Sequence, residues 1–163
     1  MNNKQTVKQL VTGAVIAAAY VVLSLLSTAL GLAFGPVQFR LSEVLCVLPI
    51  FTPSAVWGLT VGCIISNLFS PLGAVDLVFG TAATLLAALL TLLFKNCRFT
   101  VVPLLPPVIC NAVIVGAELS IFLGEVGFFA AAAGVALGEA VVVIGCGLPL
   151  CRFLKKKNIF LQD

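Results

Sequence analysis

Charged residues are so sparse along this chain that they separate long apolar blocks. None occurs from Gln9 to Phe39, and none occurs from Val44 to Val75. The second block would be about 48 Å long as one helix, well beyond a hydrocarbon core of about 30 Å, so it must fold back on itself. Thr52-Pro53 is the natural break, because threonine caps helix N-termini and proline suits the first helical turn.

The pattern predicts an all-α chain, a bundle of six apolar helices in a single transmembrane domain covering residues 1–163. We expect the helices at residues 8–29, 42–52, 53–69, 76–95, 103–123 and 126–151. The second is short, which suits a segment that does not cross the whole bilayer.

The amino-acid composition indicates that these helices span a membrane. The 163 residues are 61% hydrophobic and only 9% charged, whereas soluble domains carry about 25% charged residues. Lys4 and Lys8 followed by an apolar run resemble a secretory signal, but the run exceeds any cleavable length, so we expect a first transmembrane helix. The sequence predicts a multi-pass protein of the cell membrane.

The basic residues predict its orientation. Six alternating spans put every lysine and arginine except Arg40 on one side of the membrane. The positive-inside rule makes this side cytoplasmic. Both termini are then inside, and the loops 30–41, 70–75 and 124–125 are outside.

Several polar residues fall within the apolar blocks, in the outer half of the membrane or near its midplane. An intramembrane carboxylate costs roughly 2.5–3.5 kcal/mol on insertion scales, so such groups face the interior or a cavity. The set consists of Arg40, Glu43, Asn67, Asp76, Asn111, Glu118 and Glu139.

Some of these residues have structural alternatives. Ser42-Glu43 could cap the second helix, with Arg40 as the salt-bridge partner of Glu43. Asp76 could cap the fourth helix, and the Asn67 and Asn111 amides could join helices. These alternatives stay open at this point.

Glu118 and Glu139 point more directly to a ligand, because neither lies at a predicted helix end or near a basic residue. Asn111 and Glu118 are seven residues apart and share one helix face. Gly134-x-x-x-Gly138 precedes Glu139 and allows close approach of a helix or a ligand. Either one carboxyl is protonated or something cationic binds. Carboxylates with amides suit a small substrate that carries a positive charge or an array of N–H donors.

The chain lacks the residues that catalysis, metal binding and nucleotide hydrolysis usually need. The chain has no histidine, no nucleotide-binding G-x-x-x-x-G-K-[ST] loop and no C-x-x-C pair among its six cysteines. We therefore expect no enzyme, no metal, no cofactor and no nucleic-acid partner. If the protein pumps a substrate, the energy comes from elsewhere.

Small residues on the first helix form two pairs, Gly13-x-x-x-Ala17 and Ala14-x-x-x-Ala18. Small residues four apart let another helix approach closely. They predict a docking face for another membrane subunit, with packing inside the same bundle as the alternative.

Taken together, these motifs resemble the substrate-binding S-component of energy-coupling factor (ECF) transporters, and within that group the queuosine-precursor transporter family. The resemblance is carried by "QFRLSEVLCVLPIFTP" (38–53), by "GLTVGCIISNLFSPLGAVDLVFGTAATLLAALLT" (58–91), by the Asn111/Glu118 helix and by Gly138-Glu139.

The resemblance implies a six-helix protein that captures an aminomethyl-deazaguanine or related deazapurine outside. It would then dock on one coupling membrane subunit and two ATP-hydrolysing subunits, with Ala14 and Ala18 matching the docking motif. Glu139 and Glu118 would accept from the guanine-like edge and the ammonium, and Arg40 and Glu43 would hold the outer loop and could touch ligand. Asn67, Asp76 and Asn111 would complete the lining. The alternatives are an S-component for another vitamin or small polar cation, and an autonomous cation-coupled carrier.

Overall fold

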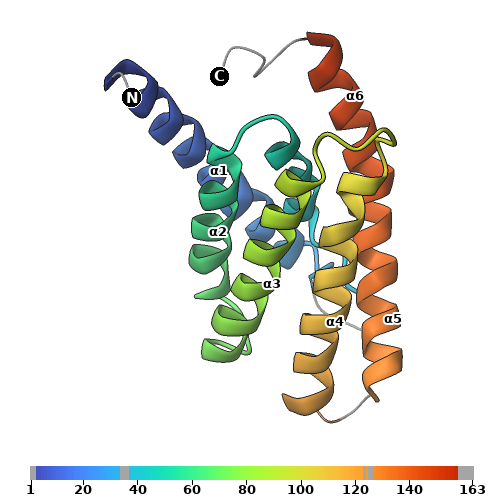
Figure 1. Ribbon diagram of the computed structural model, residues 1–163. Coiled ribbons are helices and arrows are strands. Elements are labelled where there is room, and N and C mark those ends of the chain that lie inside the picture. The colour runs from blue at the N-terminus through green and yellow to red at the C-terminus, as the bar shows by residue number, and fades with distance from the viewer. Residues whose placement is uncertain (1–2, 34–36, 123, 125–126, 158–163) are drawn as a thin grey trace.

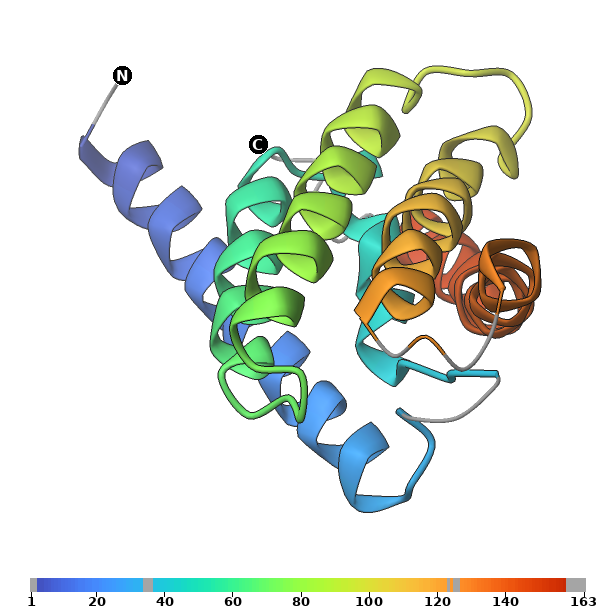
Figure 2. The ribbon, with the colours of Figure 1, turned by 90° about the horizontal axis from the view of Figure 1, so that it is seen from below.

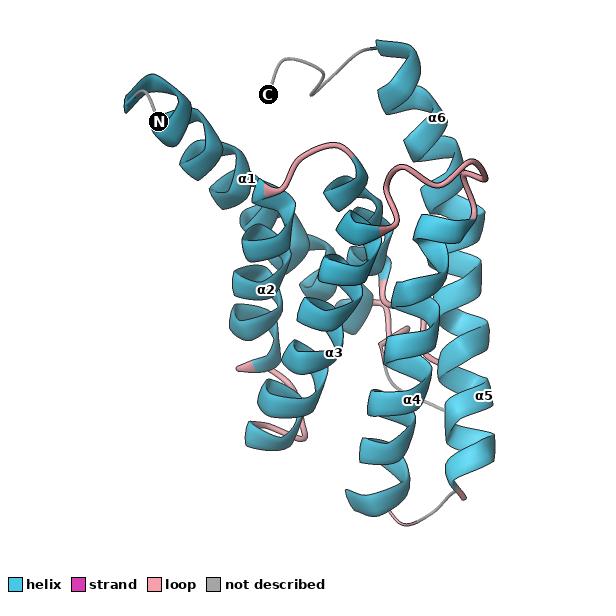
Figure 3. Ribbon diagram, viewed as in Figure 1, coloured by secondary structure: helices cyan, strands magenta, loops and turns pink. Residues whose placement is uncertain are grey.

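The computed structural model describes residues 3–33, 37–122, 124 and 127–157. All regular structure in these ranges is helical (Figures 1 and 3). In chain order the elements are α1 (Asn3–Ala29), η1 (Leu41–Ile50), α2 (Ser54–Asn67), α3 (Ala74–Leu93), η2 (Val102–Leu104), α4 (Leu105–Phe122), α5 (Phe128–Glu139), η3 (Ala140–Cys146) and α6 (Gly147–Lys157). Since η2 leads directly into α4, and α5, η3 and α6 are continuous, each of the six predicted helices is present.

Four of the helical segments are long and apolar enough to cross a membrane: Asn3–Ala29, Ala74–Leu93, Val102–Phe122 and Phe128–Lys157. The helix η1 is short, as the sequence predicts. The helix α2 is also short, because it has 14 residues, or about 21 Å. It ends two residues before the predicted boundary, in a run of turns that contains Pro71.

The break at Thr52-Pro53 is confirmed, since η1 ends at Ile50 and α2 begins at Ser54. The Thr52 hydroxyl accepts a hydrogen bond from the Ser54 backbone N–H at 3.3 Å. This turn allows one uncharged block to form two helices that lie side by side.

The last helix continues six residues beyond its predicted end, to Lys157. Lysines in the final turn interact favourably with the negative end of the helix dipole. Within this helix η3 is a π-helical segment that shortly precedes Pro149. Proline has no N–H to donate to the carbonyl four residues earlier, and this favours a local change of helical pitch.

The helices α1 and α2 cross at very short distance. A Cβ added to Gly58 would lie 2.6 Å from the Gly13 carbonyl oxygen, and one on Gly62 would lie 2.9 Å from that of Ala17. Figure 2 shows α1 running beside α2 at one edge of the molecule. Glycine at both α2 positions is what lets the two backbones approach.

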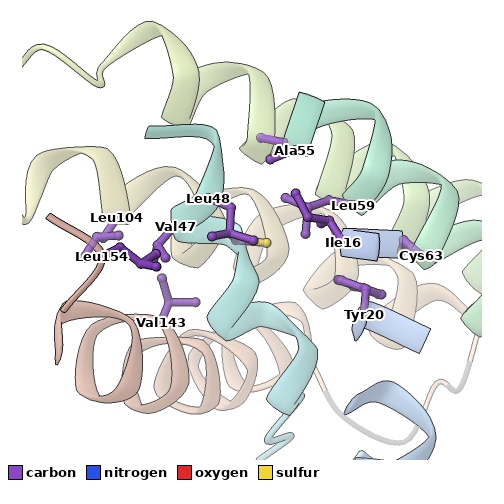
Figure 4. Close-up of a cluster of buried hydrophobic side chains, with 12 residues drawn as sticks. Ile16, Tyr20, Val47, Leu48, Ala55, Leu59, Cys63, Leu104, Val143 and Leu154 are labelled. Atoms are coloured by element: carbon purple, nitrogen blue, oxygen red, sulfur yellow. The ribbon is translucent and has the colours of Figure 1, made fainter. Parts of the chain in front are cut away.

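At the centre lies η1, which contacts α1, α2, α3, η3 and α6. Figure 2 shows it between the α1–α3 group and the α4–α6 group. Its side chains join the main apolar core, drawn in Figure 4, whose labelled members are Ile16, Tyr20, Val47, Leu48, Ala55, Leu59, Cys63, Leu104, Val143 and Leu154. The residues just before and within η1 are therefore held from several sides.

Candidate functional site

The polar residues predicted from the sequence come from five different elements or their flanks, and most are buried. Asn111, Glu118 and Glu139 are 1%, 0% and 3% exposed. Glu43 and Asn67 are also buried, whereas Arg40 and Asp76 are half-buried. None of the buried groups faces lipid, so each must be accommodated by protein or by a guest.

Asn67, at the end of α2, joins three parts of the chain. Its Oδ1 accepts from the Arg40 guanidinium at 3.3 Å, and its Nδ2 donates to the Asp76 carbonyl oxygen at 2.8 Å. Gly80 on α3 makes room, because a Cβ there would lie 2.9 Å from the Asn67 Nδ2. The Asn67 amide thus links α2 to α3, which is the helix-joining role that the sequence left open as an alternative. It also fixes the position of the Arg40 guanidinium.

Asp76 lies in the first turn of α3, and Ser70 donates a hydrogen bond to its carboxylate. Gly73, which precedes α3, has φ of +55°, a backbone conformation that L side chains rarely adopt. The turn between α2 and α3 therefore holds the Asp76 carboxylate beside the Asn67 link.

Glu43 differs from the other acids because both of its carboxylate oxygens are engaged within the chain. Tyr20 donates to Oε1 at 2.5 Å and the Cys46 thiol donates to Oε2 at 2.9 Å. In the described residues no ion pair joins Arg40 to Glu43. The Ser42 hydroxyl is buried without a hydrogen-bond partner, so Ser42 does not cap η1. The predicted Ser42 cap and the Arg40–Glu43 salt bridge are therefore wrong, and Tyr20 takes the place expected for Arg40. Glu43 does lie in the first turn of η1, as that alternative expected.

Tyr20 is the functional-site neighbour that sequence reasoning missed. It is the chain's only tyrosine and is 0% exposed in the middle of α1. A buried phenolic hydroxyl in an apolar helix usually has a hydrogen-bond partner. A lone tyrosine in an apolar run is therefore the sequence feature that could have pointed to Tyr20. The identity of the partner, 23 residues away, has no local signature.

Asn111 and Glu118 share the inward face of α4, as their spacing predicts. No hydrogen bond of ordinary length and angle reaches the Asn111 amide or either oxygen of Glu118. The Glu118 carboxyl nevertheless lies beside the Asp76 carboxyl, and the Asn111 amide lies beside Glu139. The charged groups that act on Glu118 are Asp76 and Arg40. The Glu118 carboxyl therefore lies near a second acid and one guanidinium, with hydrogen-bonding capacity to spare.

Glu139 ends α5 and is brought to the same region by Gly138. A Cβ on Gly138 would lie 1.8 Å from the Gln38 carbonyl oxygen, so only glycine lets the segment before η1 cross α5 here. Glu139 interacts electrostatically with Glu43 and Arg40, and the Asn111 amide faces it. Its Oε2 has no hydrogen-bond partner.

The arrangement leaves the carboxyl groups of Glu43, Asp76, Glu118 and Glu139 around one basic residue, Arg40. A buried acceptor without a donor costs about 1–3 kcal/mol, and more if charged. A guest with several N–H donors or a positive charge would satisfy both the open acceptors and the excess of acid.

The small residues of α1 divide into two sets. Gly13 and Ala17 are buried against α2, where the Trp57 ring fills the space beside Gly13. Ala14 and Ala18 are exposed on the other side of the helix. The first pair packs within the chain, and the second pair leaves a smooth outer surface.

A cavity of about 280 Å³ lies between α3 and α4, and none of these polar groups lines it. It is apolar and is lined by Leu90, Phe94, Val102, Leu105, Pro106, Ile109 and Cys110. It offers no donors or acceptors of the kind a polar substrate needs.

An all-helical chain with several apolar spans and acids gathered in its interior has the architecture of a membrane transporter. The comparison with known families agrees. The family described as "QueT transporter" matches residues 10–156, and the chain belongs to this family of multi-pass membrane transporters. That assignment implies a transport protein and not an enzyme.

A relative supports the family. The queuosine precursor transporter QueT of Lactococcus lactis subsp. cremoris (strain MG1363) is 37% identical over 82 residues, which are 50% of this chain and 48% of that protein. The match spans about half the length of this relative. No solved structure matches the chain.

Proposed function

We propose that this protein is the substrate-capture subunit of an ECF-type transporter, and that it binds a queuosine precursor on the outer face of the cell membrane. The cargo is an aminomethyl-deazaguanine or a related deazapurine, which partner subunits then import at the expense of ATP. The observation that carries the proposal is the set of buried polar groups without partners on Asn111, Glu118 and Glu139.

The chemistry of the cargo fits these groups. A guanine-like edge presents adjacent N–H donors, which a carboxylate accepts in parallel, and an aminomethyl group adds a cation. Glu139 and Glu118 are the acceptors, Asn111 covers the remaining polar edge, and Asn67, Asp76 and Arg40 complete the site. Glu43, whose two oxygens accept hydrogen bonds from Tyr20 and Cys46, holds η1 in position.

The partners are a coupling membrane subunit and two ATP-hydrolysing subunits. The exposed Ala14 and Ala18 on α1 support this part of the proposal, because small residues let another transmembrane helix approach closely. The chain contains no nucleotide-binding loop of its own.

The test is a calorimetric titration of the purified full chain with the aminomethyl-deazaguanine base, with thiamine and with riboflavin. We expect the deazaguanine to bind saturably and the two vitamins not to bind. If thiamine or riboflavin binds and the deazaguanine does not, the proposed cargo is wrong and the substrate is a vitamin instead.

An autonomous cation-coupled carrier is the second candidate, favoured by the excess of acidic groups over Arg40 in the interior. Reconstituted vesicles separate the two. Uptake of the base that needs ATP and the partner subunits supports the capture subunit, whereas uptake driven by an ion gradient with this chain alone supports the carrier.

A further inference from the structure

The segment that carries Arg40 is attached to α1 at two points. The Leu41 backbone N–H donates to the Ser27 hydroxyl at 2.9 Å, and Tyr20 donates to the Glu43 carboxylate at 2.5 Å. Tyr20 and Ser27 are seven residues apart and so lie on one face of α1. Both are almost fully buried, at 0% and 1% exposure. Residues 40–43 are therefore held against α1 at two points that lie two helical turns apart.

Arg40 stands at the start of this segment and connects it to the site. Its backbone is extended and its carbonyl accepts from the Glu43 N–H at 2.9 Å, so the position of Glu43 fixes that of Arg40. The guanidinium donates to Asn67 at 3.3 Å and acts on both Glu118 and Glu139.

We propose that Tyr20 and Ser27 are positioning residues that set the charge selectivity of the binding site. They hold residues 40–43 so that the Arg40 guanidinium keeps its place among the carboxyl groups, and they do not touch the substrate. The inference rests on the proposed substrate-capture function.

The physical reason is electrostatic. A fixed guanidinium offsets part of the negative potential that Glu118 and Glu139 produce in their ionised state, and charge interactions are strong where water is scarce. When the guanidinium moves away, the potential becomes more negative. A cationic guest then gains affinity relative to a neutral guest of the same shape, whereas a general loss of folding weakens both guests equally.

The experiment compares two probes on the purified full chain: aminomethyl-deazaguanine, which is a cation, and the deazaguanine without the aminomethyl group, which is neutral. The quantity measured is the ratio of their affinities. Tyr20→Phe removes the hydroxyl and keeps the ring, and we expect the ratio to move about three- to tenfold toward the cation, the effect of one buried hydrogen bond. Arg40→Gln should move the ratio in the same direction.

Three further variants complete the design. Ser27→Ala tests the second attachment and should shift the ratio in the same direction. Ile16→Val is the matched control, because it alters the same buried face of α1 without touching residues 40–43, and it should leave the ratio unchanged. In the double variant of Tyr20→Phe and Arg40→Gln, the shift should equal that of Arg40→Gln alone.

An unchanged ratio in both Tyr20→Phe and Ser27→Ala, or additive shifts in the double variant, would overturn the inference while leaving the proposed function intact. If the unaltered chain binds neither base, the proposed function fails, and this inference fails with it.

Discussion

At the scale of single residues, the buried acids are of two kinds. Glu43 has a donor for each oxygen, from Tyr20 and Cys46. Glu118 and Glu139 retain oxygens without partners. Side chains of the first kind stabilise the fold, whereas those of the second kind cost stability until a ligand arrives.

This difference predicts opposite effects on the empty protein. Glu43→Gln should lower the apparent melting temperature in detergent, with a loss of about 1–2 kcal/mol, because it weakens two buried hydrogen bonds. Glu118→Gln and Glu139→Gln should leave the melting temperature unchanged or raise it, since a neutral amide is less costly to bury than an acid without partners. Thermal unfolding of the three variants without ligand checks this, and equal losses in all three would contradict it.

The sequence was enough to find Glu118, Asn111 and Glu139, because charge in an apolar run is conspicuous and a seven-residue spacing defines a helix face. It was not enough to separate Glu43 from them. Its role depends on Tyr20, and a contact between residues 23 positions apart follows from how α1 and η1 pack.

At the scale of elements, glycines decide how closely segments approach. Gly58 and Gly62 set the crossing of α2 over α1, and Gly138 lets the Gln38 carbonyl cross α5 beside Glu139. The sequence showed small residues at these places. It did not show which partner each one meets, since that depends on the order of helices in space.

Gly138→Ala should separate the segment before η1 from α5 and so displace Arg40 and Glu139 from each other. The added Cβ would meet backbone atoms of Gln38, which cannot move aside as a side chain can. We expect at least a tenfold loss of affinity for aminomethyl-deazaguanine, about 1.4 kcal/mol. Gly145→Ala, where no atom lies within 4 Å of the added Cβ, is the control and should bind normally. Normal binding by the Gly138 variant would show that this crossing does not shape the site.

The exposed face of α1 carries a separate prediction. Ala14→Trp and Ala18→Trp point away from α2, so the isolated chain should keep its melting temperature. Association with the proposed coupling membrane subunit should fall strongly, because a bulky ring prevents close helix contact. Co-purification with that subunit measures this. Gly13→Ala, which would place a Cβ 2.0 Å from the Trp57 ring, should instead destabilise the chain itself.

At the scale of the whole molecule, the helices form two groups around η1 (Figure 2). The start of α1, the segment between α3 and η2, and the end of α6 lie at one end of the molecule, and the turn between α2 and α3 lies at the other (Figure 1). The basic residues other than Arg40 belong to the first end. The hydrophobic pattern predicted the number of helices correctly. It placed the helix ends less well, because turns and interfacial charges decide them.

The expected orientation puts Cys97 inside the cell, and Cys97 is exposed. In a chain whose other cysteines are replaced by serine, a membrane-impermeant thiol reagent should label Cys97 only after the cells are opened. Leu72→Cys, in the turn between α2 and α3, should be labelled in intact cells when Cys97 is also replaced. Labelling of Cys97 in intact cells, with Leu72→Cys labelled only after the cells are opened, would show that the predicted orientation is wrong.

The central claim is that buried acids without partners are completed by a donor-rich cationic guest. Calorimetry of the purified chain with aminomethyl-deazaguanine tests it most directly when Glu118→Gln and Glu139→Gln are measured beside the unaltered protein. Each substitution should weaken binding by about 1–3 kcal/mol. Affinities equal to that of the unaltered chain in both variants would contradict the claim.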